Sequence, residues 1–185
     1  MDNDPLEQLL DWVRHRHFGK YRGTVVANDD PTKRGRLKVR APAALGDLEL
    51  WAMPCVPYAG DQVGFFVLPE PGTGVWVEFE AGDTSYPIWT GCFWGDNQLP
   101  SAATAATAKV IRTQKTTLVM DDDAPEIHAS VDDGGEVKIA DDVIVSRDQA
   151  TVTVSTNGIT SELGSGKVAV EQSGVSINSG ALEVT

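Results

Sequence analysis

Residues 151–160 read TVTVSTNGIT, and sixteen residues further on, at 167–176, the chain repeats the pattern as KVAVEQSGVS. Two valines, one glycine and the β-branched residue after that glycine coincide in the two copies. Val184 falls another sixteen residues beyond Val168. Because alternating apolar and polar residues indicate a β-strand with one buried face, the pattern predicts a stack of short, similar strands.

Glycines mark the repeat at regular intervals, since Gly158, Gly166 and Gly174 are each eight residues apart. A period of eight with one glycine per unit predicts a strand of a few residues followed by a sharp bend. Glycine is favoured at a bend where a Cβ would clash or where φ must be positive. We therefore expect these three glycines to be the bend residues of the stack.

Each unit of the repeat supplies only two or three apolar side chains, and no aromatic residue follows Ala150. A strand face of this kind has to be buried against a facing layer. We therefore expect three chains to intertwine around one axis as a triple-stranded β-helix, with the apolar side chains inside. The expected core residues of this rod are Val152, Val154, Ile159, Val168, Val170, Val175, Ile177 and Val184. A disordered tail is the alternative interpretation of such a weakly hydrophobic sequence.

The rod is expected to span residues 109–185. Its first part has equally short strand-like runs, separated by acidic or glycine-containing turns. One of these turns, DDD at 121–123, lacks the ligand spacing of a calcium loop, so we expect a solvated turn. Residues 101–108, SAATAATA, are small and nearly featureless and are interpreted as a linker.

Residues 19–100 show the two-residue alternation without the eight-residue period. Expected strands lie at 21–27, 36–40, 49–56, 62–68, 75–80 and 86–94. Five or six short strands with no helical interruption predict a small, closed antiparallel barrel of the OB type.

The segment 1–18 is expected to contain one short helix, at residues 5–17. Pro5 suits a first helical position, and apolar residues recur behind it at a spacing of three to four. They are Leu6, Leu9, Leu10 and Val13. Since a lone helix of this length is marginal in water, its apolar stripe should dock on the barrel or on a neighbouring subunit. The chain as a whole is expected to be all-β apart from this helix.

The net charge of −12 argues against a general nucleic-acid-binding role, because phosphate neutralisation requires clustered lysine and arginine. Within the first 100 residues, every lysine and arginine lies between Arg14 and Arg40. These cations form either the solvated face of a helix and two strands or a docking surface for an acidic partner. The candidate docking residues are Arg14, Arg16, Arg22, Arg36, Lys38 and Arg40.

No catalytic, metal or cofactor site is expected. His15 and His17 lie two apart on the expected helix, so their side chains diverge by roughly 200° and are expected at the surface. Neither a nucleophile elbow nor a glycine-rich phosphate loop occurs in the sequence. Cys55 and Cys92 are expected to be buried, reduced thiols rather than a disulfide or a zinc site.

Cytoplasmic assembly is expected from the absence of targeting signals. No run approaches the roughly 18 apolar residues that span a bilayer. The acidic start MDND is unlike the basic and then apolar beginning of a secretory signal.

Several segments resemble one known family, the baseplate assembly protein V, or central spike, of contractile phage tails, tailocins and extracellular contractile injection systems. They read GKYRGTVV at 19–26, GRLKVR at 35–40, WAMPC at 51–55, PEPGTGVWVEF at 69–79 and PIWTG at 87–91. The tryptophan-rich continuation FWGDN at 93–97 looks most like the extracellular injection-system branch.

The resemblance implies a homotrimer in a phage tail-like particle assembled inside the producing bacterium. It implies an OB-fold collar that attaches to the baseplate hub and the inner tube, and a β-helical needle that contacts the target membrane only on contraction. The helix and the six basic residues would then belong to the end that faces the hub.

Two departures from relatives in this family matter. Some relatives carry a lysozyme domain between collar and rod, where this chain has only residues 101–108, so no wall cleavage is expected. Others end in a His-x-His motif that binds iron, whereas the end of this chain reads GALEVT. We therefore expect a separate tip protein of the PAAR type to cap Leu182, Val184 and Thr185.

Two other functions remain open from the sequence. The first is an OB barrel that binds oligosaccharide or single-stranded nucleic acid and carries a flexible tail, against which stand the acidic charge and the spaced glycines. The second is a fragment of a phage tail-fibre adhesin, against which stands the plain, small-residue end of the chain.

Overall fold

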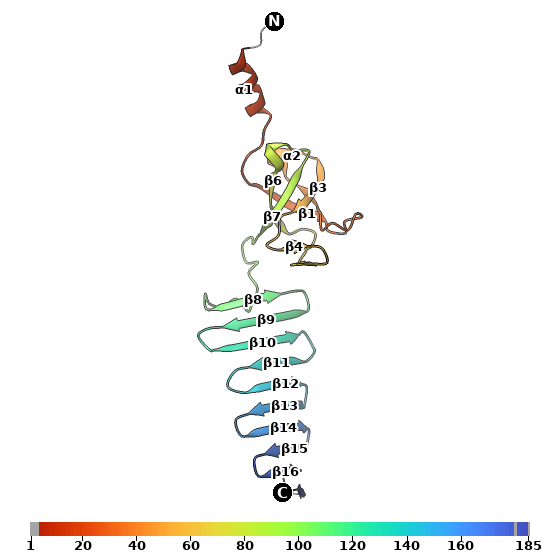
Figure 1. The fold of residues 1–185 in the computed structure, drawn as a ribbon, viewed down its shortest axis with the longest axis vertical. Coiled ribbons are helices and arrows are strands. Elements are labelled where there is room, and N and C mark those ends of the chain that lie inside the picture. Colours follow the sequence, from red (N-terminus) through yellow and green to blue (C-terminus); the bar gives the residue numbers. More distant parts are fainter. Residues whose placement is uncertain (1–3, 180, 185) are drawn as a thin grey trace. The chain divides into compact units, whose positions relative to one another are not determined.

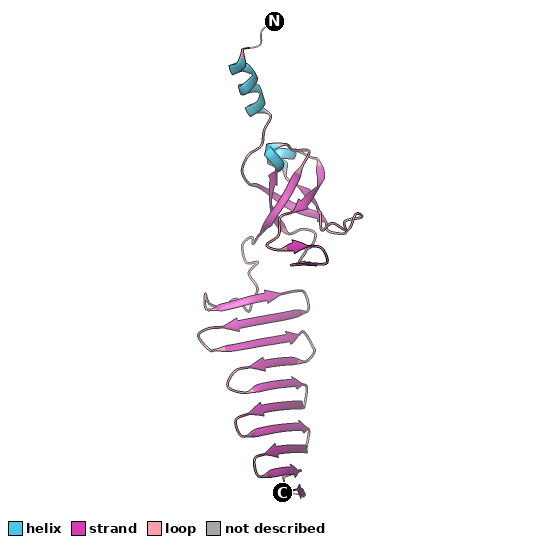
Figure 2. Ribbon diagram, viewed as in Figure 1, coloured by secondary structure: helices cyan, strands magenta, loops and turns pink. Residues whose placement is uncertain are grey.

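The computed structural model describes residues 4–179 and 181–184, with the side chains of 183 and 184 left out. The chain forms two compact units, residues 1–98 and 99–185. Strands dominate both units, as Figure 2 shows, and the expectation of a mostly β protein with one N-terminal helix is confirmed.

Helix α1 spans Pro5–Arg14, so it ends three residues before the predicted end of the 5–17 helix. The side chain of Asp4 caps it by accepting a hydrogen bond of 3.0 Å from the Leu6 amide. The chain leaves the helix because the next residues bind the barrel: the His17 amide donates to the Gly82 carbonyl oxygen at 2.9 Å. No residue of α1 is buried.

The first unit contains a closed barrel of five strands, in the order β1-β2-β3-β7-β6 (Figure 1). Their bounds are β1 Tyr21–Ala27, β2 Leu37–Arg40, β3 Glu49–Pro54, β6 Gly74–Phe79 and β7 Pro87–Phe93. Two short helical turns join them, α2 at Pro42–Leu45 and η1 at Glu80–Gly82. The pairing of β3 with β7 is parallel, whereas an antiparallel barrel was expected throughout. Between these two strands the chain runs through β4 (Ala59–Gly60), β5 (Val63–Gly64) and β6, and the antiparallel pairing of β6 with β1 closes the barrel.

Alternation along these strands fills the barrel interior with side chains. Fully buried residues include Val25 of β1, Leu37 and Val39 of β2, and Val75 and Val77 of β6. Trp89 of β7 is also buried, and its indole nitrogen donates to the Gly35 carbonyl oxygen at 3.3 Å.

Gly23 shows why strand β1 of the barrel carries a glycine. A Cβ on Gly23 would lie 2.9 Å from Cγ2 of Val77 and 3.1 Å from the carbonyl oxygen of Arg40. Strand β1 can therefore approach its neighbours this closely only without a side chain at that position.

The strand predicted at 62–68 is wrong for most of its length. Only a short hairpin forms here, and each of its strands has two residues, β4 Ala59–Gly60 and β5 Val63–Gly64. Gln62 adopts a positive φ of 58° at its turn, and the chain leaves the pairing after Gly64. Residues 65–67 are apolar but exposed, with Phe66 at 78%, so their hydrophobicity does not mark a buried strand.

The second unit is one sheet of ten strands, in which each strand pairs antiparallel with the strand before it and the strand after it (Figure 1). The strands are β8 Ala108–Arg112, β9 Thr116–Asp121, β10 Glu126–Val131, β11 Glu136–Ile139, β12 Val143–Arg147, β13 Ala150–Ser155, β14 Gly158–Leu163, β15 Gly166–Glu171, β16 Gly174–Ile177 and β17 Leu182–Val184. The expected stack of short strands is therefore present. Its ladder hydrogen bonds join neighbouring strands of one chain.

Six-residue strands and two-residue turns together produce the eight-residue period of the tail. Gly158, Gly166 and Gly174 are the first residues of β14, β15 and β16. Gly158 and Gly174 have φ values of +153° and +146°, a region that favours glycine. Gly166 differs, because the turn before it takes its positive φ at Gly164.

Candidate functional site

The register of the ten-stranded sheet arranges its side chains in rows, because residues directly opposite one another on antiparallel strands lie on the same face. One continuous row crosses all ten strands, and we call it row 1. It consists of Lys109, Met120, Ile127, Ile139, Val143, Val154, Ile159, Val170, Val175 and Val184. Only Lys109, on the first strand, is not apolar.

A second row runs beside it on the same face, two residues away along each strand, and we call it row 2. It consists of Ile111, Leu118, Ala129, Val137, Val145, Val152, Ser161, Val168, Ile177 and Leu182. Every residue predicted for the rod core falls in row 1 or row 2. One face of the sheet is therefore apolar on all ten strands, apart from Lys109 in row 1 and Ser161 in row 2.

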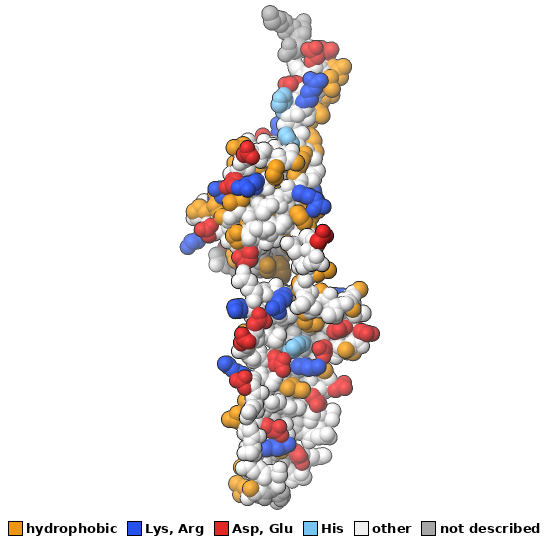
Figure 3. Space-filling view, turned by 180° about the vertical axis from the view of Figure 1, so that it is seen from behind, with side chains coloured by type: hydrophobic (Ala, Val, Ile, Leu, Met, Phe, Trp, Pro, Cys, Tyr) orange, Lys and Arg blue, Asp and Glu red, His pale blue; other side chains and the backbone are white. Residues whose placement is uncertain are grey.

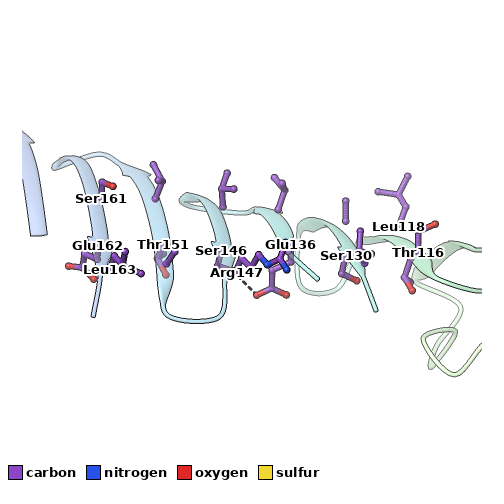
Figure 4. Close-up of a pocket in the computed structure, with 18 of the residues that line it drawn as sticks. Thr116, Leu118, Ser130, Glu136, Ser146, Arg147, Thr151, Ser161, Glu162 and Leu163 are labelled. Carbon is purple, nitrogen blue, oxygen red and sulfur yellow. Dashed lines mark hydrogen bonds between the residues drawn. The ribbon is translucent and has the colours of Figure 1, made fainter. Parts of the chain in front are cut away.

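This apolar face is uncovered in the single chain. Val154, Ile159 and Val170 of row 1 are 44%, 47% and 45% exposed. The part of row 2 from Ile111 to Ser161 contributes to the lining of an open groove, where Figure 4 shows Ser161 and Leu118 projecting in one direction. A continuous apolar surface across ten strands is much larger than a soluble monomer ordinarily exposes, so this face is an interface for another chain.

The opposite face carries polar and charged side chains that pair with one another across the strands. Lys138 bonds Glu126 at 2.5 Å, and Lys167 bonds Glu162 at 2.9 Å. Nε2 of His128 lies 2.9 Å from Glu136, and this contact is the main reason that the pKa of Glu136 is lowered. Charged side chains of both signs are visible along this unit in Figure 3. The polar face suits contact with water.

The six candidate docking cations of the first unit do not form one free basic patch. Most are neutralised inside the unit: Arg16 by Asp83 at 3.4 Å, Arg36 by Asp30 at 2.8 Å, and both Lys38 and Arg40 by Glu49. The two cations on β2 also lower the pKa of Glu49, with Arg40 contributing most.

Arg22 and Arg14 behave differently from the other four. The Arg22 guanidinium lies over the rings of Trp76 and Phe93, at 4.9 and 4.7 Å from their centroids. Within the described part of the chain, Arg14 on α1 forms no ion pair. The clustering of cations in the sequence could not show which of them are neutralised, because the fold decides whether Asp30, Glu49 and Asp83 reach them.

Asp30 organises the loop between β1 and β2, a role that the sequence did not reveal. Its side chain is almost fully buried and accepts hydrogen bonds from the amides of Thr32 at 3.0 Å and Arg34 at 2.8 Å. The side chain of Arg36 approaches it as well, and this bond is the main reason that the pKa of Asp30 lies far below its ordinary value. The Arg36 guanidinium in turn lies 5.4 Å from the ring centroid of Trp51.

The predicted burial of the two cysteines is wrong, since both thiols are free and exposed. Cys55 follows the last residue of β3. Cys92 lies beyond a register shift in the pairing of β7 with β6, opposite Val75 and next to the last residue of β7, where it is exposed. The surface position predicted for His17 is also wrong, because the residue lies beyond the helix, half-buried between the rings of Tyr21 and Phe79.

Across residues 4–179 and 181–182 the structure contains no group of three or more histidine, cysteine, aspartate or glutamate side chains that could hold a metal ion. Among the described helices, none is long and apolar enough to cross a membrane.

Comparison with protein families gives one description for each unit. Residues 21–94, which contain the barrel, match the model of the type VI secretion system and phage-baseplate injector OB domain. Residues 108–183, which contain the ten-stranded sheet, match the model of the phage baseplate V C-terminal trimerisation domain. No curated protein matches the chain. A trimerisation domain accounts for the uncovered apolar face, and the chain therefore belongs to the baseplate V family of phage-tail and type VI injector spikes and forms homotrimers.

Proposed function

We propose that three copies of this chain form the central spike of a contractile, phage tail-like injector and pierce the target envelope when the sheath contracts. The observation that carries this proposal is the pair of rows on β8–β17, apolar except at Lys109 and Ser161, exposed in one chain and repeated on strand after strand. Three such faces packed around an axis bury both rows and leave the charged faces outside.

The strand arrangement suits an axial load. Ladder hydrogen bonds between β-strands run perpendicular to the strands and therefore along the stack, over a distance of about 43 Å for ten strands. A load along that direction presses each strand onto the next. Packed valine and isoleucine rows resist bending of the three sheets relative to one another.

Piercing of this kind is mechanical and uses no enzymatic activity. Two observations favour this view: the barrel interior is filled by packed side chains, and only residues 99–107 separate the first unit from β8. That separation is too short for a further domain. Nucleic acid plays no part in the proposed function.

Attachment to the hub and inner tube is assigned to the N-terminal helix. Its apolar residues Leu6, Leu9 and Val13 are about half exposed, and Arg14 stands at its end without an acidic partner among the described residues. Because Arg16, Arg36, Lys38 and Arg40 are neutralised inside the barrel unit, they support such a contact less well than α1 does.

The last strand is proposed to receive a tip protein of the PAAR type. Leu182 is 56% exposed, and β17 pairs on one side with β16, so its other edge is open within the chain. Val184 continues row 1 by its backbone register. The third candidate tip-docking residue, Thr185, lies outside the described residues.

A cryo-EM reconstruction of the native particle, in the extended and contracted states, tests the proposed function. The expected result is a threefold density on the baseplate axis that accommodates three copies of this chain and moves into the target envelope on contraction. Finding the chain on the periphery of the particle, as in a fibre, would reject a central spike. The same particles would be assembled in the cytoplasm of the producing cell, which fractionation of intact cells can check.

A further inference from the structure

Ser161 interrupts row 2, which otherwise contains only apolar residues. Its direct neighbours across the sheet are Val152 on β13 and Val168 on β15. In the single chain its side chain is exposed on the apolar face, on the same side as Leu118 (Figure 4). Once three chains cover this face, the hydroxyl group is enclosed by valine.

Ser161 also occupies the middle of its strand. The side chains of β14 on the apolar face are Ile159, Ser161 and Leu163, because side chains on one face of a strand are two residues apart. The homotrimer has closed symmetry, so equivalent strands from the three chains lie at one level around the axis. The middle residue on the inner face comes closest to that axis, and three Ser161 side chains therefore meet there.

Three serine hydroxyl groups around an axis can satisfy one another. Each hydroxyl has one donor and can accept, so each donates to the next and the third closes the ring. A hydroxyl group that faces only valine and isoleucine has no such partner, and burying it without a hydrogen bond destabilises the assembly. The polar layer is therefore satisfied only when the three chains are aligned.

The sequence repeat makes this alignment necessary. If one chain slips along the axis by sixteen residues, or two strands, Val152 takes the place of Val168, and Val154 takes the place of Val170. Both rows then still pack apolar against apolar. Position 161 breaks the repeat, because its counterparts sixteen residues away are Val145 and Ile177, both apolar members of row 2. A slipped chain leaves its serine facing them.

We propose that Ser161 sets the register of the trimer, by favouring the alignment in which three hydroxyl groups meet and by disfavouring alignments shifted by one repeat. Polar residues at single core positions specify register in coiled coils by the same physical reasoning. The proposal rests on the trimer and on its inward-facing apolar rows, and it is independent of the piercing role.

Cysteine pairs at repeat-related positions can measure the register directly. Two forms of the full chain, one with Val152→Cys and one with Val168→Cys, are co-expressed with different tags, both carrying Cys55→Ser and Cys92→Ser. After oxidation, disulfide-linked peptides are quantified by mass spectrometry. Aligned chains form 152–152 and 168–168 links. A link between 152 and 168 requires a slip of two strands. In aligned chains these two positions lie about 9.6 Å apart along the stack, which is too far for a disulfide.

The experiment is carried out with Ser161, Ser161→Thr and Ser161→Val in both forms, with Thr160→Val as the control on the opposite face. We expect at least tenfold more of the 152–168 link in Ser161→Val than in the other three. An equal amount in all four, whether high or undetectable, overturns the proposal. So does the absence of every 152–152 link in a sample that light scattering shows to be trimeric, because row 2 then does not face the axis. Ser161→Ala, read in the same way, replaces the valine variant if that variant does not assemble.

Discussion

Val154 on β13 lies directly opposite Ile159 on β14, and both side chains are more than two-fifths exposed in the single chain. The pair belongs to row 1, where the same arrangement recurs on successive strands. Because the strands already bond with one another inside the chain, the free energy of trimer formation comes from covering these side chains and not from completing the sheet.

Val154→Lys is therefore expected to prevent trimer formation. An ammonium group forced into the covered face without an acidic partner costs about 3 kcal/mol or more per chain. Light scattering on the purified full chain should show mass falling from about three times 19.8 kDa towards 19.8 kDa. Thr153→Lys, on the adjacent residue and opposite face, is the matched control and should remain trimeric. If the two variants have the same mass, the assignment of the faces is wrong.

Gly158→Ala is expected to lower the melting temperature of the second unit, and Gly166→Ala is expected to change it little. A Cβ at Gly158 would lie 2.3 Å from the carbonyl oxygen of Val170, while at Gly166 the nearest atom is the Leu163 carbonyl oxygen at 3.4 Å. The first contact forces the backbone apart, in addition to about 1–3 kcal/mol for the positive φ. Circular dichroism melts of the two variants measure the difference. Equal melting temperatures would show that the close contact and the positive φ at Gly158 do not matter for stability.

The tail of this protein could be predicted from its sequence because its information is local. Alternation places Val152 and Val154 on one face, and the two-residue turns that reverse the chain impose the period of eight. Whether each strand forms its hydrogen bonds within the chain or with another chain could not be predicted in this way. A strand that pairs with its chain neighbour and one that pairs with another chain have the same alternation.

The surface of the barrel was predicted less well, because its contacts join residues far apart in the sequence. Arg16 meets Asp83, and the alternation of β7 is interrupted before Cys92 by a register shift against β6. Apolar residues at 65–67 resemble a buried strand, but their exposure depends on where the hairpin leaves the barrel. Local pattern carries none of this information.

Acid is expected to destabilise the barrel through Asp30. Folding lowers the pKa of this carboxyl group, chiefly through its bond with Arg36, so the ionised form contributes stability above the unfolded pKa of about 3.9. That contribution is lost as the pH falls below this value towards the folded pKa. Tryptophan fluorescence during urea unfolding, repeated between pH 7 and pH 2, measures it. Asp30→Asn should be less stable at pH 7 and should lose less stability on acidification. Asp29→Asn, at the exposed neighbouring position, is the control. If Asp30→Asn has the same stability at each pH as the unsubstituted protein, Asp30 does not cause the loss of stability in acid.

Leu9→Glu is expected to separate hub attachment from trimer formation. Leu9 lies on the apolar stripe of α1, where it is 56% exposed and contributes nothing to the barrel core, so a charge there leaves the fold and the trimer intact. A hub that covers the stripe would have to bury that charge, which weakens the contact by about 3 kcal/mol, or more than a hundredfold in affinity. Binding to the hub protein of the same particle can be measured by biolayer interferometry. Glu7→Gln, which lies roughly 200° away around the helix, is the matched control. If Leu9→Glu binds as tightly as the control, the hub contacts another surface, and the stripe of α1 is covered by something else.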